Sequence, residues 1–426
     1  MSSTRAMATR DAVLQRIVPF ELPSWAAGYF TKPPVHGRIP LGNLPTPLHP
    51  IHAPHHGSTS NTSSILQQFH DRGISLYTKR DDMSGGVELG GNKIRKLEFL
   101  LADALRADAT QVVTIGGEQS NHCRATAAAA RMIGLEPHLI LRTRRVSDTS
   151  EDFGMTGNIL FDRMVGSTIY TCTPGEYGRL GSVALVQRLC KHLAASEDSR
   201  PYAIPVGGSN GLGSFGYIQA VDELLSQWKQ SEQSSLDHIV FACGSGGTAA
   251  GIVLGIALAF RQEQATSPPT IHAVGVCDSP DYFYKFVAGI ADEMGFCPPN
   301  DNVTTEEFMR QHMIVHQGKG LGYAVSTEEE LDFVSQFALE TGMSLDPVYS
   351  GKALYTFVKH VVENSDNDKS FQPGTNVLFW HTGGALGLYD KGDDLLKRLQ
   401  QQSPVLRLDV YGKDLENSVD ISTTEE

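Results

Sequence analysis

The chain is poor in cysteine, and its cysteines are not arranged as a cluster. Six of them are scattered along the sequence, and no C-x-x-C pair occurs. Structural zinc sites need closely spaced thiolates, and disulfide-stapled secreted domains need a dense cysteine framework. The sequence therefore disfavours both classes and fits reduced thiols inside a cell.

Long apolar runs and excess positive charge are also missing. The longest apolar run, 248–260, is too short to span a bilayer and predicts a buried helix. No apolar core of a signal peptide occurs near residue 1. The formal net charge is −13, which argues against nonspecific binding to nucleic acid. We therefore expect partners to be neither a membrane nor a nucleic acid.

The N-terminal region leaves two points open. Residues 1–20 are rich in arginine but interrupted by Asp11, so a mitochondrial transit peptide and an ordinary frayed terminus are both compatible with them. The predicted compartment is cytoplasmic, or mitochondrial if this segment directs import. Further on, 33–54 is proline-rich, and four histidines crowd at 49–56 without cysteine or acidic partners. We expect no metal site there.

Strand-like and helix-like segments alternate through most of the chain. With 40% hydrophobic and 19% charged residues, the composition is that of a globular protein with a large core. Apolar and β-rich runs predict strands at 74–79, 111–117, 138–142, 168–172, 238–243 and 377–380. Helical periodicity predicts helices at 92–105, 157–164, 183–193, 215–228, 248–260 and 328–341, with another one ending near 132. This alternation predicts an α/β fold with parallel sheets and helices on both faces.

A glycine-rich stretch with a lysine is the most informative part of the sequence. Two glycine pairs, 85–86 and 90–91, precede Asn92 and Lys93, and an amphipathic helix follows. Glycine lets the backbone take positive φ, and a helix N-terminus favours anions. Burial and nearby cations lower the pKa of an amine and make it nucleophilic. Lys93 is therefore a candidate Schiff-base nucleophile, although a turn with a solvated basic patch has the same pattern.

Two further loops follow predicted strands. The stretch Glu118 to Arg124 lies between a strand and a helix, where α/β proteins bind ligands. Its side chains suit a carboxylate, but Ser120 also fits an ordinary N-cap. The glycine-rich stretch 244–251 starts the apolar helix and predicts a phosphate site. It also fits a dinucleotide fingerprint, whose acidic residue would be the distant Asp278.

Several motifs resemble those of one family of pyridoxal-phosphate (PLP) enzymes. They are Lys79-Arg80-Asp81-Asp82 followed by Gly-Asn-Lys-x-Arg-Lys-Leu-Glu, the Gln-Ser-Asn-His segment 119–122, the glycine loop at 207–211, and Asp-Pro-Val-Tyr at 346–349. The family contains D-cysteine desulfhydrase and 1-aminocyclopropane-1-carboxylate (ACC) deaminase and is tryptophan-synthase-β-like. The resemblance spans about 44–388.

The resemblance implies a fold type II PLP enzyme with two domains whose twisted sheets are rich in parallel strands. It implies a large domain, which binds PLP, made of 1–97 and 212–426, with 1–43 as an N-terminal extension. The small domain would be 98–211, so the chain leaves the large domain and returns. It also implies a homodimer acting on a small amino acid.

The resemblance also assigns roles to residues. Lys93 would carry PLP, with Ser120, Tyr349 and Tyr323 at the reacting centre. The residues expected to bind the cofactor are Lys93, Lys96, Asn121, Gly244, Ser245, Gly246, Gly247, Thr248 and Thr382. The residues expected to bind the substrate are Ser120, Asn121, His122 and Ser350.

Ser350 and Thr382 bear on which reaction is catalysed. ACC deaminases typically carry glutamate and leucine at these two positions, and glutamine at that of His122. A glutamate near the pyridine nitrogen would deepen the electron sink that opening an unactivated ring requires, and a hydroxyl does not. We therefore predict elimination of sulfide from D-cysteine to give pyruvate, hydrogen sulfide and ammonia. The alternatives are ACC deamination, a NAD-binding oxidoreductase, and a ligand binder without catalysis.

Overall fold

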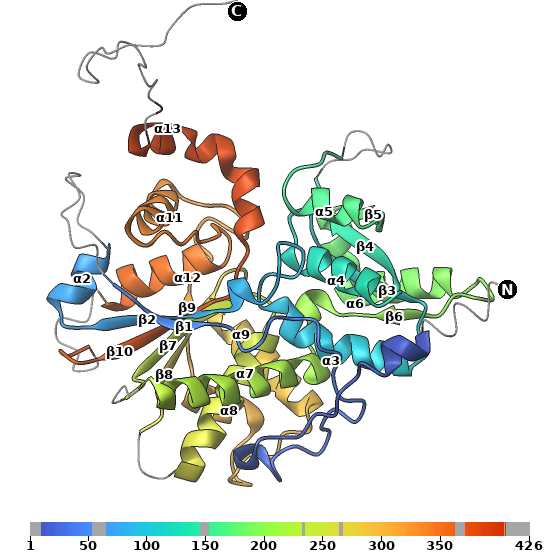
Figure 1. Ribbon diagram of the computed structural model, residues 1–426, viewed down its shortest axis with the longest axis horizontal. Helices are drawn as coiled ribbons and strands as arrows, with labels where there is room; N and C mark the ends of the chain where they lie inside the picture. The colour runs from blue at the N-terminus through green and yellow to red at the C-terminus, as the bar shows by residue number, and fades with distance from the viewer. Residues whose placement is uncertain are drawn as a thin grey trace, which may run out of the picture.

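The computed structural model describes residues 10–52, 65–144, 153–231, 235–263, 267–362, 371–403 and 405. Within them the chain forms a six-stranded and a four-stranded β-sheet, each covered by helices. Figure 1 shows the larger sheet on the left and the smaller one on the right. The predicted α/β class with parallel-rich sheets is confirmed.

The larger sheet has the strand order β1-β2-β10-β7-β8-β9. Its strands are β1 (Leu48–Ile51), β2 (Ser75–Arg80), β7 (His238–Cys243), β8 (Thr270–Gly275), β9 (Ile314–Gln317) and β10 (Asn376–His381). Only the β1–β2 pair of this sheet is antiparallel. The last strand of the described residues, β10, lies between β2 and β7, with Val377 level with Leu76 on one side and His238 on the other. Every residue of β7 and β10 is buried, which explains their continuous apolar sequences.

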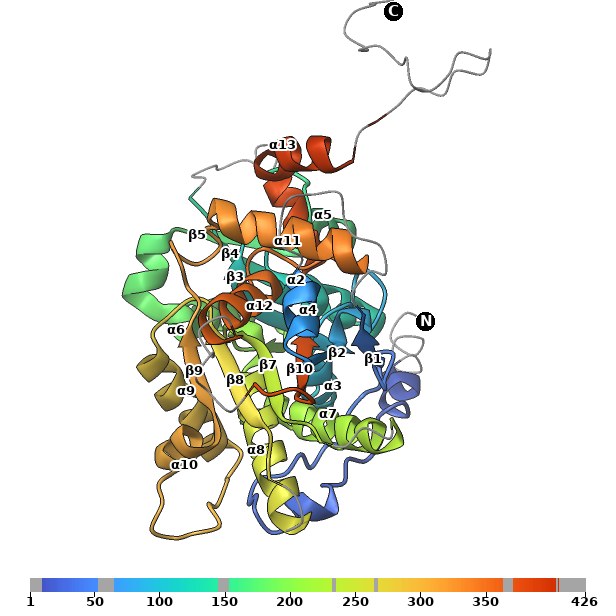
Figure 2. The ribbon, with the colours of Figure 1, turned by 90° about the vertical axis from the view of Figure 1, so that its left-hand side faces the viewer.

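Helices cover both faces of the larger sheet, as the two views in Figures 1 and 2 show. One face carries α7 (Gly211–Gln230), α8 (Gly247–Glu263), α9 (Pro280–Glu293) and α10 (Thr305–His312). The other carries α2 (Ile65–Asp71), α11 (Glu328–Thr341) and α12 (Ser350–Phe357), and α13 (Gly392–Gln402) packs on α11. Neighbouring residues of β10 enter opposite cores, Phe379 on the α12 side and Trp380 on the α7 side, because side chains alternate along a strand.

The smaller sheet is parallel throughout, in the order β5-β4-β3-β6. Its strands are β3 (Gln111–Gly117), β4 (Glu136–Arg142), β5 (Thr168–Cys172) and β6 (Pro201–Ala203). It is flanked by α4 (Asn121–Met132), α5 (Asn158–Met164) and α6 (Pro174–Leu193). Helix α6 is kinked at Gly181, where φ is +77°, and the helix predicted from Val183 is only the part after this kink.

Helix α3 (Lys93–Arg106) packs against α7 on one side and α4 on the other. The N-terminal segment docks onto its C-terminal end. Residues 10–14 are helical, and the Arg10 guanidinium donates to the carbonyls of Leu105 and Ala109, both at 2.9 Å. An ion pair with Asp108 at 2.9 Å completes the contact. The chain from Arg10 onward is thus tied to the folded body, while the predicted domain boundaries at 97 and 211 stay a prediction.

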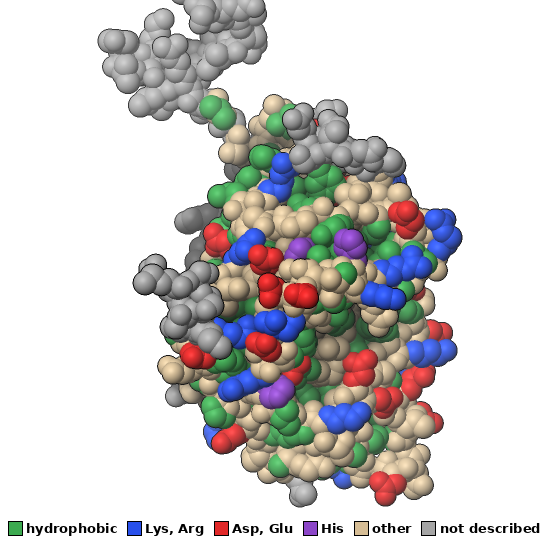
Figure 3. Space-filling model, turned by 90° about the vertical axis from the view of Figure 1, so that its right-hand side faces the viewer, with side chains coloured by type: hydrophobic (Ala, Val, Ile, Leu, Met, Phe, Trp, Pro, Cys, Tyr) green, Lys and Arg blue, Asp and Glu red, His purple; other side chains and the backbone are tan. Residues whose placement is uncertain are grey.

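The surface shows mixed charge. On the face drawn in Figure 3, acidic and basic side chains alternate without gathering into one large area of either sign. Within the described ranges, no helix is long and apolar enough to cross a membrane.

Candidate active site

A cavity of about 370 Å³ lies where the two sheets meet. Five parallel strands direct their C-terminal ends at it: its walls include Gly117 of β3, Arg142 of β4, Cys243 of β7, Cys277 beyond β8 and Thr382 beyond β10. Ligands of open α/β sheets bind at the carboxyl ends of strands, and the volume is in the range of small-molecule sites. This cavity is the candidate active site.

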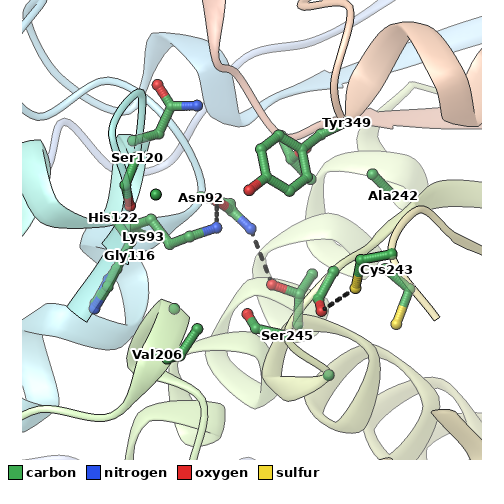
Figure 4. Close-up of a pocket in the computed structure, with 18 of the residues that line it drawn as sticks. Asn92, Lys93, Gly116, Ser120, His122, Val206, Ala242, Cys243, Ser245 and Tyr349 are labelled. Atoms are coloured by element: carbon green, nitrogen blue, oxygen red, sulfur yellow. Dashed lines mark hydrogen bonds between the residues drawn. The ribbon is translucent and has the colours of Figure 1, made fainter. Parts of the chain in front are cut away.

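Lys93 reaches the cavity from the first turn of α3. Its Nζ donates to Asn92 Oδ1 at 2.7 Å, and Asn92 Nδ2 donates to Thr248 Oγ1 at 3.0 Å (Figure 4). Burial lowers the pKa of Lys93 from 10.5 to about 8, with Asp346 opposing and Arg124 reinforcing the shift. With a pKa of about 8, the neutral, nucleophilic amine is present in about one molecule in ten at pH 7 and in about half of the molecules at pH 8.

The loop before Lys93 is clamped by an arginine from the smaller sheet's side. Arg124 of α4 donates through Nη1 to the carbonyls of Val87 at 2.6 Å and Glu88 at 2.7 Å, and through Nη2 to that of Gly90 at 3.0 Å. Charge-assisted hydrogen bonds of this kind are strong. Arg124 therefore fixes the approach of the chain to Lys93.

The glycine loop between β7 and α8 faces the same cavity. Helix α8 begins at Gly247, so its first N–H groups have no partner within the helix and its dipole attracts anions. Gly246 has φ of +73°, and a Cβ there would lie 2.8 Å from Phe286 Cδ1. A Cβ on Gly244 would lie 3.0 Å from Tyr349 Cε1. The loop leaves its backbone accessible to an anion because side chains do not fit there.

Lys96 and Gly247 were expected to bind the phosphate, but neither lines the cavity, and both donate a hydrogen bond to Ser209 instead. Lys96 Nζ is fully buried and donates to Ser209 Oγ at 3.1 Å, as does the Gly247 N–H at 3.2 Å. The Ser209 hydroxyl in turn donates to Ser245 Oγ at 2.8 Å. Burial, and then the charge of Lys93, hold the pKa of Lys96 well below its usual value. Ser209 is thus the link from Lys96 to the loop.

Ser120 is both an N-cap and a cavity residue. Its Oγ accepts from the Cys123 N–H at 3.2 Å at the start of α4, and its side chain borders the cavity. As an N-cap it uses only the oxygen, so its hydroxyl proton is left for a ligand. Gly116 makes room for it, because a Cβ there would lie 2.3 Å from Ser120 Oγ.

His122 borders the cavity, but its ring is already engaged. Its Nε2 is 2.8 Å from Thr114 Oγ1, whose hydroxyl donates to the Ile204 carbonyl at 2.9 Å, so His122 Nε2 is the donor. Burial, with the charges of Lys93 and Lys96, holds the pKa of His122 well below 6.5. Any contact with a substrate carboxylate is therefore left to the backbone N–H at the start of α4 and not to an imidazolium.

The two tyrosines meet above Lys93. The hydroxyls of Tyr323 and Tyr349 are 2.5 Å apart, and Lys93 Nζ is 5.9 Å from the centroid of the Tyr349 ring. Burial raises the pKa of both phenols, so both stay protonated at neutral pH. The Tyr349 ring faces into the cavity in Figure 4.

Ser350 and Thr382 take different positions. Thr382 borders the cavity. Ser350 is buried outside the cavity lining, with its Oγ 2.6 Å from Asp346 Oδ1 and 2.9 Å from the Gly383 carbonyl. The Asp346 carboxylate also accepts the backbone N–H groups at the start of α12. Ser350 thus orders the α12 N-terminus and does not face the cavity.

The structure brings most of the predicted residues together. Those that line the cavity are Lys93, Ser120, Asn121, His122, Gly244, Ser245, Gly246, Thr248, Tyr323, Tyr349 and Thr382. Lys96, Gly247 and Ser350 lie behind its lining. The sequence interpretation missed the lining residues Asn92, Arg142, Tyr177, Cys277, Tyr282 and Phe286. Arg142 could have been found, because it ends a predicted strand, whereas Tyr177, Tyr282 and Phe286 lie on helical stretches that were not predicted.

Comparison with known proteins agrees with this geometry. The profile of the family described as "Pyridoxal-phosphate dependent enzyme" matches residues 41–383. The chain belongs to this family. The expected cofactor is therefore confirmed as PLP, and the nicotinamide interpretation of the glycine loop is not needed.

Named relatives specify the resemblance further. The chain is 41% identical over 420 residues, 97% of its length and 95% of the relative's, to the "Bifunctional D-cysteine desulfhydrase/1-aminocyclopropane-1-carboxylate deaminase, mitochondrial" of Arabidopsis thaliana. It is 38% identical to the "Putative 1-aminocyclopropane-1-carboxylate deaminase" of Thermotoga maritima, over 74% of this chain and 91% of that one. The expected similarity to this family is confirmed.

Solved structures confirm the fold. An ACC deaminase homologue superposes with a TM-score of 0.65 and 28% identity, covering 88% of this chain and 98% of its own. The fungal L-serine ammonia-lyase of Rhizomucor miehei superposes with a TM-score of 0.53, at 18% identity and with 82% and 97% coverage, and supports the fold type alone.

The residues present fit PLP. The cavity holds one primary amine of lowered pKa, Lys93, which suits attachment of an aldehyde. It also holds an open glycine loop at a helix N-terminus, which suits a phosphate dianion. Asn92 joins the two through its hydrogen bonds to Lys93 and Thr248.

Proposed function

We propose that this enzyme is a lyase that converts D-cysteine and water into pyruvate, hydrogen sulfide and ammonium. The observation that carries the proposal is the absence of a carboxylic acid at Ser350 and Thr382: Thr382 gives the cavity a hydroxyl, and Ser350 is held by Asp346. A weakly polarised cofactor ring suits elimination of a good leaving group such as thiolate. The bifunctional name of the Arabidopsis relative supports the same activity.

The cofactor would be held by Lys93, by the loop Gly244 to Thr248, and by the side chains of Asn121 and Thr382. When bound, PLP supplies an electron sink for the pair released at Cα. The enzyme's own task is to orient the substrate and to handle protons.

The substrate carboxylate would bind at the N-terminus of α4. The Ser120 hydroxyl and the backbone N–H groups of Asn121 and His122 lie there, and the helix dipole favours the negative charge. Because Arg124 of the same helix also clamps the loop before Lys93, carboxylate and amine sites are held in one rigid unit.

Proton transfer divides between two groups. The Lys93 amine, with its pKa of about 8, is able to take a proton near neutral pH. The Tyr323–Tyr349 pair stays protonated, so it suits donating to a departing thiolate. Ser120 is the other hydroxyl in reach of the carboxylate site.

ACC deamination is the second candidate. It is favoured by the ACC deaminase names of the Arabidopsis and Thermotoga relatives and by the structural likeness to an ACC deaminase homologue. Opening the unactivated ring asks for a deeper electron sink than a threonine hydroxyl provides. We therefore place it second.

A product assay across substrates tests the choice. Purified enzyme is incubated with D-cysteine, L-cysteine, D-serine and ACC, and sulfide, pyruvate and 2-oxobutyrate are measured. We expect sulfide and pyruvate from D-cysteine and little or no 2-oxobutyrate from ACC. Efficient release of 2-oxobutyrate by the wild type would contradict the proposal.

Exchange of the two deciding residues sharpens the test. Ser350→Glu combined with Thr382→Leu should shift activity toward ACC and away from D-cysteine. The new glutamate would stand beside Asp346, whose charge repels it, so it is stabilised only when it is protonated or turned toward the cavity. Ser196→Glu on the exposed surface is the control for added charge and should change neither activity. Bound PLP absorbance verifies that the double variant is folded.

Assembly and compartment are part of the proposal. We infer a homodimer from the family resemblance, which light scattering of the purified enzyme checks. Because Arg10 is docked on α3, a removable import segment would end before this residue. Fluorescent fusions with and without 1–9 distinguish a mitochondrial enzyme from a cytoplasmic one.

A further inference from the structure

Arg142 stands out among the cavity residues that no step above employs. It is the last residue of β4, and its guanidinium carbon lies 4.9 Å from the centroid of the Tyr177 ring and 5.5 Å from that of Tyr323. Across the described ranges, no hydrogen bond or ion pair with another side chain or carbonyl accompanies these ring contacts. A guanidinium carries five N–H donors, so a ligand in the cavity meets a charge to which no described carboxylate is bonded.

Two arginines with a structural role in this protein donate hydrogen bonds to backbone carbonyls. Arg124 donates to three loop carbonyls, and Arg131 donates to the carbonyls of Val165 and Gly166 at 2.8 and 2.7 Å. Arg142 instead has two aromatic faces, which hold a guanidinium in place and leave its edge available. The cavity lining includes one acid, Asp278, which is exposed and whose Oδ1 accepts the Ser279 N–H at 2.8 Å.

The ring contacts also place Arg142 relative to the reacting groups. Tyr323 bonds Tyr349, and the Tyr349 ring stands 5.9 Å from Lys93 Nζ. Arg142 is therefore connected through Tyr323 to the tyrosine pair beside the amine, and in the smaller sheet it lies level with Gly117 of β3, three residues before Ser120. A substrate bound by its amino and carboxylate groups has its β-substituent as the remaining group to place.

We propose that Arg142 binds the substituent that leaves Cβ as an anion. This site then selects β-substituted D-alanines whose leaving group is, or becomes, negatively charged. The inference rests on the proposed function. In the step, the Cα–H and Cβ–S bonds break and a carbon–carbon double bond forms. The proton goes to a base of the site, and the sulfur departs with its electron pair as thiolate beside the guanidinium. Water then releases pyruvate and ammonium.

A matched pair of ligands tests the binding part directly. D-Cysteate and D-alanine differ only by a sulfonate on Cβ, and calorimetry measures their binding to the holoenzyme. We expect Arg142→Gln to weaken the binding of D-cysteate by about tenfold or more, which is the scale of one charge-assisted hydrogen bond. The affinity for D-alanine should change by no more than about twofold. Arg142→Lys, which keeps the charge, should recover part of the loss. Arg188→Gln, an equal charge change on the exposed side of α6, should change neither ligand.

Turnover separates the inference from the function that it rests on. Arg142→Gln should lower kcat/KM for S-sulfo-D-cysteine, whose leaving group is charged from the start, more than for D-cysteine. Equal weakening of D-cysteate and D-alanine, or no weakening of either, would overturn the role of Arg142. If the wild type releases no sulfide from D-cysteine while D-cysteate still binds through Arg142, the function fails and the anion site stands.

Discussion

Two groups of charged side chains, each with one member on helix α3, are built in opposite ways. In the first, Lys79, Asp81, Arg95 and Glu223 form a closed network of two cations and two anions. In the second, the cations Lys93 and Arg142 border the cavity, and within the described chain neither has a carboxylate bonded to it. Lys93 and Arg95 are only two positions apart, so their different fates come from the faces of the helix that they occupy.

In the closed network, the carboxylate of Asp81 accepts hydrogen bonds from four side chains. Asp81 accepts from Arg95 at 2.9 Å, from Thr46 at 2.9 Å, from Tyr217 at 2.7 Å and from Trp380 Nε1 at 2.9 Å. Although burial acts in the opposite direction, Arg95 holds the pKa of Asp81 below its usual value. The network therefore ties α3 to β2, α7 and β10. Fixed in this way, the helix presents Lys93 to the cavity, where no described carboxylate is bonded to Lys93 or Arg142 and where we propose that phosphate, carboxylate and leaving group bind.

Removing the cavity lysine should have the largest effect on activity. Lys93→Ala should lower turnover by at least about a thousandfold, because both cofactor attachment and a proton carrier are lost. The fold should persist, and the visible absorbance of the attached cofactor, reducible by borohydride in the wild type, should be absent. Lys191→Ala on the exposed side of α6 is the control. A Lys93→Ala protein that keeps a reducible band and turnover would disprove the assignment.

Removing the network arginine should act on stability instead. Arg95→Met should lower the free energy of unfolding by about 3–5 kcal/mol, because the buried Asp81 and the partly buried Glu223 both lose the guanidinium bonded to them. Arg106→Met, at the exposed end of the same helix, should change it by no more than about 0.5 kcal/mol. Urea unfolding of the holoenzyme measures both. Equal midpoints for the two variants would mean that the network does not hold α3 in place.

A side chain added to the glycine loop should selectively lower the affinity for the cofactor. Gly246→Val should weaken PLP binding by about tenfold or more. Valine rarely adopts the φ of +73° found at this position, and its side chain would clash with Phe286. Gly289→Val, at an exposed position of α9 with open space around it, controls for valine in place of glycine. Titration of the apoenzyme with PLP gives both affinities. Protection from heat by NADH but not by PLP would favour the dinucleotide alternative.

The smallest expected effect is a pH dependence of cofactor attachment. With a pKa of about 8, the neutral fraction of Lys93 rises about tenfold from pH 7 to pH 9 and then levels off. The rate at which apoenzyme binds PLP covalently should follow this curve. A lysine at its ordinary pKa of 10.5 would instead give a rate that keeps rising tenfold per pH unit to pH 10. Stopped-flow absorbance between pH 6.5 and 10 distinguishes the two.

Strands and loops were predictable from the sequence where local pattern alone decides them. The strands 111–117, 168–172 and 238–243 were predicted with their observed bounds, because each is a short apolar run ended by turn residues. The lysine loop and the glycine loop were predictable for the same reason, since their glycines serve local backbone geometry.

The partners that the Ser350 and Arg142 side chains take were not predictable from the sequence pattern. Ser350 was expected at the cavity, but it lies within one helical turn of Asp346 and bonds to that carboxylate instead. Arg142 meets Tyr177 and Tyr323 only because α6 and the loop before α11 fold over the end of β4. The kink at Gly181 hid the first half of α6, so Tyr177 was not placed on a helix.

The position of β10 has a consequence for biosynthesis. The ribosome makes β2 and β7 long before β10, yet the two belong to one sheet only when β10 is inserted between them. Until then each strand presents an unpaired edge, and the edge of β7 belongs to a mostly apolar strand that is buried in the finished sheet, which favours aggregation. The nascent chain therefore cannot complete the cofactor site, because Thr382 and the sheet centre arrive with the final strand. Chaperone protection should matter most in the interval after β7 is made and before β10 is released.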